Sequence, residues 1–314
     1  MGNSMEKRAF GGSNLDVSVL GFGGAPIGVL DTEQAQIETI LNALLDQGVN
    51  VIDTAAGYAG SEEAIGKAVA HRRDQFILVS KCGQASDDLD GEAWSAQVIS
   101  QTVDLALRRL QTDHLDVMLL HTCDLETLKN GEALSALVDA REAGKVRFIG
   151  YSGDNEAGVY AAEHPEVAVI ETSINICDQA NIDAVLPKAI ENGVGVIAKR
   201  PIANAAWKEL SDQPGFYATY AKTYTERLAK MGVSPSDLGF EGEPDCVWPE
   251  IALRFTLSQP GVQTAIIGTT NPAHMEANIQ AAEKGPLSAE TVEMLRTAFH
   301  QAESATAENW NGLT

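Results

Sequence analysis

Eight short apolar runs alternate with amphipathic stretches along this chain of 314 residues, and this alternation constrains its fold more than any other feature. The runs are rich in valine, isoleucine and leucine. They are apolar throughout, as expected of parallel strands that are covered on both faces. They span residues 19–23, 49–54, 76–81, 116–121, 146–152, 167–173, 195–200 and 264–269.

The stretches between these runs have the spacing of amphipathic helices. Gly48 and Gly144 stand where two of these helices would end. Eight β–α repeats in a chain of this length predict an α/β fold, namely a (β/α)8 TIM barrel. The three clearest apolar stripes are formed by Ile37, Ile40, Leu41, Leu44 and Leu45, by Ile99, Val103, Ala106, Leu107 and Leu110, and by Leu134, Leu137 and Val138.

Three additions to the barrel are expected. Residues 7–20 carry a Gly-Gly-Ser-Asn turn between short apolar stretches, which predicts an N-terminal β-hairpin that closes the barrel floor. Residues 203–248 form a long loop after the seventh strand, of the kind that typically covers a substrate, and an extra helix is expected at the C-terminal end. No linker divides the chain, so residues 1–314 are interpreted as one domain. The aromatic residues of the long loop are Trp207, Phe216, Tyr217, Tyr220, Tyr224 and Trp248.

Charge and composition exclude several classes of protein. The 22 basic and 44 acidic residues give a formal net charge of −22, and a field of this sign repels the phosphate backbone of nucleic acid. No run of about 18 apolar residues occurs, which argues against a membrane protein, and the N-terminal residues lack the apolar stretch of a secretory signal. The four cysteines show no C-x-x-C spacing and predict reduced thiols in a cytoplasmic protein.

Ionisable residues end three successive apolar runs. Asp53, Lys81 and His121 stand at or near the carboxyl ends of these runs, and Tyr58 follows in the loop after the first of them. Because the carboxyl ends of neighbouring parallel strands meet at one mouth, these side chains are expected to lie together. Side chains alternate along a strand, so buried aliphatic residues lead up to each charged one at the rim. An acid, a phenol, an ammonium and an imidazole in one dry site predict a tuned proton donor.

The loop from Asp53 to Gly66 also has a purely structural interpretation. Ser61 would cap the helix that follows the loop, and Glu62 and Glu63 would favour the first turn of that helix. The two interpretations are compatible with each other. Three consecutive strands that each end in an ionisable residue favour a catalytic role for this mouth.

With these motifs in this order, the chain resembles the aldo-keto reductases over about residues 10–287. The resemblance implies an oxidoreductase that reduces aldehydes or ketones with NAD(P)H, or oxidises the corresponding alcohols or sugars. The motifs are L-G-F-G-G, D-T-A-x-x-Y followed by S-E-x-x-I-G, V-S-K, L-L-H, G-K-V-R-F-I-G-Y-S and I-I-G-T-T-N-P. The catalytic tetrad of the family falls on Asp53, Tyr58, Lys81 and His121.

The resemblance gives each member of this tetrad a role. Tyr58 would pass a proton to the carbonyl oxygen, and the Lys81 ammonium would strengthen this phenol as an acid. Asp53 would pair with Lys81 and hold it in place. His121 would orient the carbonyl of the substrate. In the reverse direction, Tyr58 as phenolate would accept the proton of the alcohol.

A nicotinamide site is also implied, with three departures from the family pattern. Gly153 replaces an Asn, Glu171 replaces a Gln, and Lys199 stands where the family usually has an aromatic residue that stacks on the nicotinamide. A glutamate can accept a hydrogen bond from the carboxamide NH₂ but cannot donate one. The residues implied in cofactor binding are Gly23, Ser152, Gly153, Glu171, Lys199, Arg200, Pro201, Ile202, Gly268, Thr269, Thr270, Asn271, His274 and Asn278.

A phosphate site is expected after the last strand. Asn271 precedes Pro272 and would cap a helix whose N-terminal amides face an anion. Asn278 matches an adenine-contacting Asn of the family. Family habit favours NADP(H), but only His274 stands where NADPH-selective members usually carry Lys or Arg, which leaves NAD(H) open.

The substrate is expected to be a small carbonyl or alcohol compound, and the protein a monomer or weak homo-oligomer. No metal site is predicted, because His121 and Cys123 lack the spacing of a zinc site. Two other functions stay open at this point. One is a non-catalytic, nicotinamide-binding regulatory subunit on the same fold, and the other is an aldolase with Lys81 as Schiff-base nucleophile. The residues expected to line the substrate pocket are Ile27, Cys82, Cys123, Trp207 and Trp310.

Overall fold

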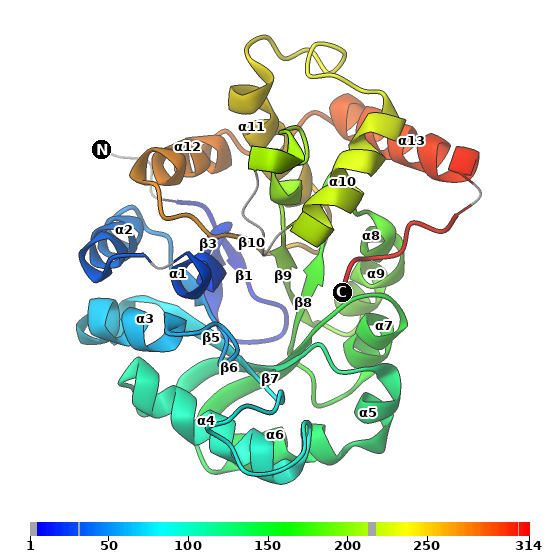
Figure 1. Ribbon diagram of the computed structural model, residues 1–314. Helices are drawn as coiled ribbons and strands as arrows, with labels where there is room; N and C mark the ends of the chain where they lie inside the picture. Colours follow the sequence, from blue (N-terminus) through cyan, green and yellow to red (C-terminus); the bar gives the residue numbers. More distant parts are fainter. Residues whose placement is uncertain (1–4, 31, 213–217, 307) are drawn as a thin grey trace.

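The centre of the molecule is a closed barrel of eight parallel strands (Figure 1). The computed structural model describes residues 5–30, 32–212, 218–306 and 308–314. Each predicted run overlaps one strand, so the predicted (β/α)8 barrel is confirmed. The strands are β3 Leu20–Gly23, β4 Val51–Asp53, β5 Ile77–Cys82, β6 Leu115–His121, β7 Val146–Ser152, β8 Val169–Ser173, β9 Gly195–Lys199 and β10 Thr264–Ile267, and β10 pairs with β3 to close the barrel.

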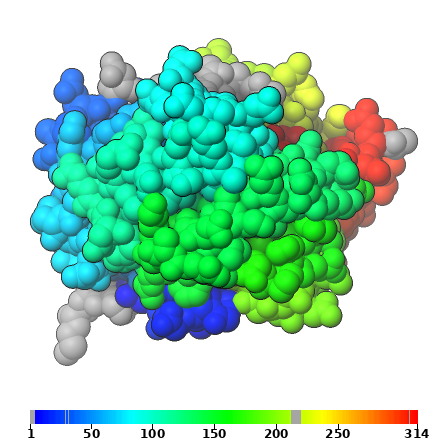
Figure 2. Space-filling model, turned by 90° about the horizontal axis from the view of Figure 1, so that it is seen from below, coloured from blue at the N-terminus to red at the C-terminus, as the bar shows by residue number. Residues whose placement is uncertain are grey.

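Helices surround the barrel and cover its outer face (Figure 1). Figure 2 shows the molecule from outside, where the middle part of the chain, coloured cyan to green, forms a continuous surface. None of the helices in the described ranges is long and apolar enough to cross a membrane. They are α1 Ala25–Val29, α2 Gln34–Asp46, α3 Ser61–Val69, α4 Ala96–Leu110, α5 Leu125–Asn130, α6 Glu132–Glu142, α7 Asn155–Glu163, α8 Ala180–Ala184, α9 Leu186–Glu191, α10 Ala218–Met231, α11 Pro244–Leu257, α12 Pro272–Glu283 and α13 Ala289–Thr306, with 3-10 segments η1 Ala70–Gln75, η2 Ala203–Ala205 and η3 Leu210–Asp212.

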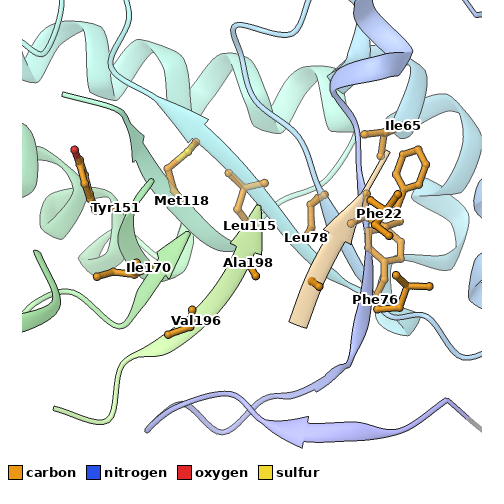
Figure 3. Packing of buried hydrophobic residues seen from close by; sticks show 14 of the residues in the cluster. Phe22, Ile65, Phe76, Leu78, Leu115, Met118, Tyr151, Ile170, Val196 and Ala198 are labelled. Atoms are coloured by element: carbon orange, nitrogen blue, oxygen red, sulfur yellow. The ribbon is translucent and has the colours of Figure 1, made fainter. Parts of the chain in front are cut away.

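The predicted apolar stripes face the barrel. All five stripe residues of α2 are buried, as are most of those of α4 and α6. Gly48 ends α2 with a φ of 84°, a left-handed conformation that favours glycine. The helices cover side chains that point outward from the strands, among them Leu78, Met118 and Ile170 (Figure 3). Burial of this layer therefore holds the helices on the barrel.

The interior of the barrel is a separate apolar core, closed at its floor by the N-terminal hairpin. The hairpin pairs β1 Lys7–Ala9 with β2 Asp16–Ser18 and adds Phe10 to the core. Gly195 lies against the Phe10 ring, and a Cβ at this position would come within 2.7 Å of it. The predicted hairpin is thus confirmed. The residues that the barrel strands contribute to this interior core are Val51, Ile77, Val79, Val117, Leu119, Val169, Ile197 and Ile266, and Val17 of β2 also belongs to it.

The long loop after β9 and the C-terminal part of the chain share a second outer core. This core contains Tyr224 of α10, Trp248 of α11 and Phe299 of α13, all buried. The predicted extra C-terminal helix is confirmed as α13, which packs beside α10 (Figure 1). Phe216 and Tyr217 of the long loop lie outside the described residues.

Candidate active site

Alternation along the strands decides which side chains enter the mouth of the barrel. Five aliphatic residues of the interior core, on β4, β5, β6, β8 and β9, are each followed two positions later by a polar residue. Residues two apart on a strand point to the same face, so these polar residues also point inward, at the carboxyl end. They are Asp53, Lys81, His121, Glu171 and Lys199.

Lys81 is the centre of this group and is fully buried. Its Nζ donates to both carboxylate oxygens of Asp53, each at 2.7 Å, and to the backbone oxygen of Thr54 at 3.1 Å. Glu171 Oε2 lies 3.2 Å away on the other side. Burial opposes the charged ammonium, but the two carboxylates outweigh it and raise the pKa of Lys81. A lysine held in its charged form is a poor Schiff-base nucleophile, which argues against the aldolase alternative.

Tyr58 and His121 lie directly beside Lys81. Lys81 Nζ is 5.2 Å from the centroid of the Tyr58 ring, and the rings of Tyr58 and His121 meet edge to face with centroids 5.6 Å apart. Burial and the nearby Lys81 charge lower the pKa of His121 to about 3. His121 is therefore neutral at physiological pH. The four tetrad residues thus come together as predicted.

The acidity of Tyr58 differs from the expectation. Lys81 does favour the phenolate, but burial is the larger effect, and Asp53 and Glu171 act in the same direction as burial. The net result raises the pKa of Tyr58 to about 12. Tyr58 in the structure is therefore fully protonated at neutral pH.

Asp53 and Glu171 form a buried carboxylate pair on Lys81, and Glu171 is an addition to the predicted tetrad. Burial, followed by the negative charge of Glu171, raises the pKa of Asp53. Lys81 and Lys199 hold the pKa of Glu171 below its usual value despite burial. Ser152 Oγ donates to Glu171 Oε1 at 3.2 Å, while Oε2 accepts no hydrogen bond from any described residue. Glu171 Oε2 is thus buried against Lys81 Nζ, which lies 3.2 Å away.

The structure explains why Gly153 replaces the Asn of the family pattern. A Cβ at Gly153 would lie 2.3 Å from the hydroxyl oxygen of Tyr151. That hydroxyl is fixed because it donates to the backbone oxygen of Cys123 at 2.7 Å. The Tyr151 ring therefore occupies the space that a longer side chain would need.

Lys199 is paired by a residue that the sequence analysis missed. Asp154, in the loop after β7, lies 3.1 Å from Lys199 Nζ and is buried. Asp154 also accepts from Thr172 Oγ1 at 2.8 Å and from the Ser173 amide at 2.7 Å. These donors and Lys199 hold the pKa of Asp154 below its usual value, although burial opposes them. Asp154 could have been identified from the sequence as a site residue, because it stands two positions after the predicted fifth strand of the barrel.

Arg200 points toward the C-terminal segment. Its Nη1 donates to Ser173 Oγ at 2.8 Å and to the backbone oxygen of Leu313, and its guanidinium lies 3.9 Å from the centroid of the Tyr220 ring. Leu313 N also donates to Asp178 Oδ2 at 3.0 Å. The carboxyl ends of β8 and β9 are therefore covered by the C-terminal residues, which sequence spacing could not show. Pro201 and Ile202 follow at the start of the long loop.

Cys82 and Cys123 do not lie where the pocket prediction placed them. Lys81 points into the barrel, so Cys82, the next residue on the strand, points outward. Ser80, on the same face as Cys82, donates to Glu62 of α3 at 2.7 Å. Both cysteines belong to the outer core between strands and helices, with exposures of 2% and 3%. The structure thus replaces their predicted pocket role with a packing role.

The other predicted pocket residues are distributed over two cores. Ile27 belongs to α1 and is buried in the outer core. Trp207 stacks on Trp248 with centroids 6.2 Å apart, at the edge of the second outer core. Trp310 is 3% exposed and packs on Phe299, with centroids 5.1 Å apart. The structure does not bring Ile27, Trp207 and Trp310 together in the lining of one pocket.

The prediction that Ser61 caps α3 is wrong. Gly60, with a φ of 72°, precedes the helix, and no side chain caps its first amides. Ser61 is inside the helix and is buried, and its hydroxyl donates to the backbone oxygen of Gly24 at 3.0 Å. Thr54 Oγ1 lies 2.9 Å from the same hydroxyl. Ser61 therefore joins α3 to the ends of β3 and β4 instead of capping the helix.

The predicted cap after β10 is confirmed. Asn271 Oδ1 accepts from the Ala273 amide at 2.9 Å, and Pro272 is the first residue of α12. Thr269 Oγ1 accepts from the Asn271 amide at 3.1 Å, and Thr270 is also part of this turn. His274 is exposed on the first turn, whereas Asn278 is buried. The first turn of α12 is thus open to solvent, in the arrangement expected of an anion site.

Gly23 and Gly268 bring the ends of β3 and β10 together. A Cβ at Gly268 would lie 2.5 Å from the backbone oxygen of Gly23. Close packing of the two strand ends therefore requires glycine at position 268. Among the described residues, no group of three or more His, Cys, Asp and Glu side chains could hold a metal ion.

Comparison with known proteins agrees with this architecture. The sequence matches the model of the Aldo/keto reductase family over residues 19–299. It is 26% identical over 291 residues to L-galactose dehydrogenase of Arabidopsis thaliana, with 88% of each chain covered. It is also 26% identical over 309 residues to the NADH-specific methylglyoxal reductase of Escherichia coli, covering 88% of this chain and 93% of that protein. The holo structure of aldo-keto reductase AKR11C1 from Bacillus halodurans superposes with a TM-score of 0.77 at 27% identity, covering 94% of this chain and 96% of that chain.

Proposed function

Because the chain belongs to the aldo/keto reductase family and is an oxidoreductase of carbonyl and alcohol groups, we propose that it transfers hydride between NAD(P)H and a small carbonyl compound, with Tyr58 as proton donor. One observation carries this proposal. A buried lysine, held by Asp53 at 2.7 Å, lies against the ring of Tyr58, and the neutral His121 ring meets the Tyr58 ring edge to face. This arrangement supports proton transfer at the carboxyl end of the barrel.

Each residue of the tetrad has a role that follows from its state in the structure. Tyr58 is protonated at neutral pH, so it can donate to a carbonyl oxygen as that oxygen gains negative charge. His121 is neutral, so one ring nitrogen can donate a hydrogen bond to the same oxygen and orient it. Lys81 is charged and stabilises the phenolate that Tyr58 becomes. Asp53 fixes the position of Lys81.

The residues at the mouth fit a nicotinamide cofactor, which would supply or accept the hydride when bound. Glu171 Oε2 is ion-paired with Lys81 at 3.2 Å, and as a carboxylate oxygen it can also accept a hydrogen bond from the NH₂ group of a carboxamide. Ser152 and Lys199 lie beside Glu171 and complete the polar wall. The first turn of α12, with Thr269, Thr270 and Asn271, would bind a phosphate of the cofactor. Gly23, Gly153, Arg200, Pro201, Ile202, Gly268, His274 and Asn278 would complete the cofactor groove.

The cofactor preference and the substrate class are proposed in coarse terms. We favour NADP(H), because it is the cofactor that members of the family usually use. NAD(H) is the alternative, because the exposed His274 is the only basic residue that the sequence offers for the extra phosphate. One relative is an L-galactose dehydrogenase, named for a sugar, and another is a methylglyoxal reductase, named for a small carbonyl compound. We therefore propose a small polar aldehyde, ketone or sugar as the substrate. We also propose that the protein is cytoplasmic.

Binding of NADPH and NADH, measured by quenching of tryptophan fluorescence, tests the cofactor site directly. Tight binding of either nucleotide is expected, and the ratio of the two dissociation constants gives the preference. A panel of aldehydes, ketones and sugars then tests turnover with the preferred nucleotide. Absence of binding would contradict the proposal. Tight binding without turnover on the whole panel would instead favour the regulatory-subunit alternative.

A further inference from the structure

Residues 311–314 form a strap over the carboxyl ends of β8 and β9, where Figure 1 shows the C-terminal end of the chain. The backbone of the strap makes no hydrogen bond to the backbone of any other described segment, so side chains supply its polar contacts. Asn155 Oδ1 accepts from the Gly312 amide at 2.8 Å, and Asn155 Nδ2 donates to the backbone oxygen of Gly312 at 2.9 Å. A Cβ at Gly312 would lie 2.6 Å from Asn181 Nδ2. The groove therefore recognises the bare backbone of the strap.

Charged side chains hold two further residues of the strap. Arg227 Nη2 donates to the backbone oxygen of Asn311 at 2.9 Å, and Asp178 Oδ2 accepts from the amide of Leu313 at 3.0 Å. Trp310, which precedes the strap, is buried against α13 and anchors it. The strap can thus leave its groove by breaking its contacts with side chains, without unfolding a helix or a strand.

The strap also binds the guanidinium of Arg200. The two lysines that enter the mouth of the barrel, Lys81 and Lys199, are ion-paired with buried carboxylates at 2.7 and 3.1 Å. Arg200 forms no ion pair with any carboxylate of the described residues. It donates instead to a hydroxyl group and to the backbone oxygen of Leu313, and it stacks on an aromatic ring. Arg200 is therefore a cation that an anionic ligand can use once it leaves Leu313.

A nucleotide cofactor brings a negative pyrophosphate group to this mouth. The protein carries a formal net charge of −22, so this group needs a local cation. The first turn of α12 offers amide groups but no lysine or arginine. A phosphate oxygen carries negative charge that the backbone oxygen of Leu313 lacks, and arginine binds phosphate in a bidentate geometry. An exchange of this backbone oxygen for a phosphate oxygen therefore strengthens the contacts of Arg200.

Resting on the proposed function, we propose that the backbone oxygen of Leu313 holds the place of a phosphate oxygen, and that Arg200 leaves it for the pyrophosphate when a nucleotide binds, which loosens the strap. The strap and the nucleotide then compete for one guanidinium. Such coupling is reciprocal, so the docked strap weakens nucleotide binding by the same factor by which the nucleotide weakens docking of the strap. A hydrogen bond to a charged group accounts for a factor of about ten or more.

The first test compares nucleotide affinity with and without the strap. NADPH and NADH are titrated against the full chain and against a chain that ends at Trp310, with tryptophan fluorescence as the signal. We expect the dissociation constant of the shortened chain to be lower by about tenfold, because Arg200 no longer has to leave Leu313. Gly312→Ala is a second variant, which keeps the chain length and displaces the strap through its contact with Asn181, and its dissociation constant should also fall.

Two controls separate competition for Arg200 from other effects of the strap. Asn309→Ala changes an exposed residue of the same segment outside the strap, and its affinity should equal that of the full chain. In Arg200→Gln the shared cation is absent, so removal of the strap should no longer change the dissociation constant. A strap that only blocks the mouth would still reduce affinity in Arg200→Gln by the same factor, and that result would overturn the proposal.

Hydrogen exchange of the strap gives a readout that needs no turnover. Mass spectrometry follows the amides of Gly312 and Leu313, which donate to side chains of the groove. Saturating nucleotide should raise their exchange rates by about tenfold, and unchanged or slower exchange would contradict the proposal. Equal affinities of the full and shortened chains would also overturn it and leave the proposed function standing. Absence of nucleotide binding in both chains would overturn the proposed function and this proposal together.

Discussion

The two ends of the barrel treat buried charge in opposite ways. At the floor, Asp116 is 2% exposed and each of its oxygens is satisfied: Oδ1 accepts from Arg147 at 2.7 Å, and Oδ2 from Arg73 at 2.6 Å and the Leu78 amide at 2.9 Å. At the mouth, two carboxylates share Lys81, and Glu171 Oε2 has no hydrogen bond. A buried charge with a full set of partners is tolerated by the fold, and removal of a partner is costly, whereas crowded charges shift ionisation and suit catalysis.

Tyr58→Phe at the mouth should have the largest effect. The change removes the proton donor and leaves the ring, so turnover should fall by about 10²–10⁴-fold. Nucleotide binding and the free energy of unfolding should stay close to wild type. Steady-state kinetics and fluorescence titration provide the measurement. Tyr160→Phe on α7 is the matched control, and equal activities of the two variants would remove Tyr58 from the mechanism.

Asp116→Asn at the floor should separate stability from activity. It removes both ion pairs of a buried carboxylate and leaves two arginines partly unpaired, so the free energy of unfolding should fall by about 2–4 kcal/mol. The kcat of the folded protein should change little. Denaturant unfolding measures the first quantity. The surface pair Asp104–Lys145, at 2.6 Å, gives the control Asp104→Asn, for which we expect at most about 1 kcal/mol.

Gly195→Ala tests whether the hairpin closes the floor by packing alone. The new methyl group would lie 2.7 Å from the Phe10 ring, and overpacking of this kind costs about 1–3 kcal/mol. Combining it with Phe10→Leu, which frees space, should recover part of the loss. Thermal unfolding of the two single variants and the double variant measures this coupling. Additive losses would show that the ring and the glycine do not contact each other.

His121→Gln should have the smallest effect on stability at neutral pH, and its effect should grow as the pH is lowered. Burial lowers the pKa of His121 to about 3, while a histidine in the unfolded chain titrates near 6.5. Between these values the unfolded state binds more protons, so the free energy of unfolding falls as the pH is lowered from about 6.5 to about 3. His121→Gln should flatten this part of the curve. The exposed His300→Gln is the control, and an unchanged slope in His121→Gln would contradict the assignment.

The fold and the core of the site could be predicted from local patterns. The period of two along the strands carries Asp53 and Lys81 inward, and the same rule turns Cys82 outward, although the pocket prediction ignored it. The apolar stripe of α2 and its terminal Gly48 follow the period of 3.6. Such features depend on neighbours in sequence, so the sequence is sufficient to find them.

Contacts between distant parts of the chain could not be predicted in this way. Asp154 reaches Lys199 only because β7, β8 and β9 are adjacent in the barrel, and Leu313 reaches Arg200 across 113 residues. The net acidity of Tyr58 depends on how completely the assembled barrel excludes water from it. Local alternation of side chains by itself determined the barrel and the inward direction of Asp53, Lys81 and His121. Closure of the barrel decided which charges share one dry space, because the strength of a charge depends on its neighbours and on the water that folding removes.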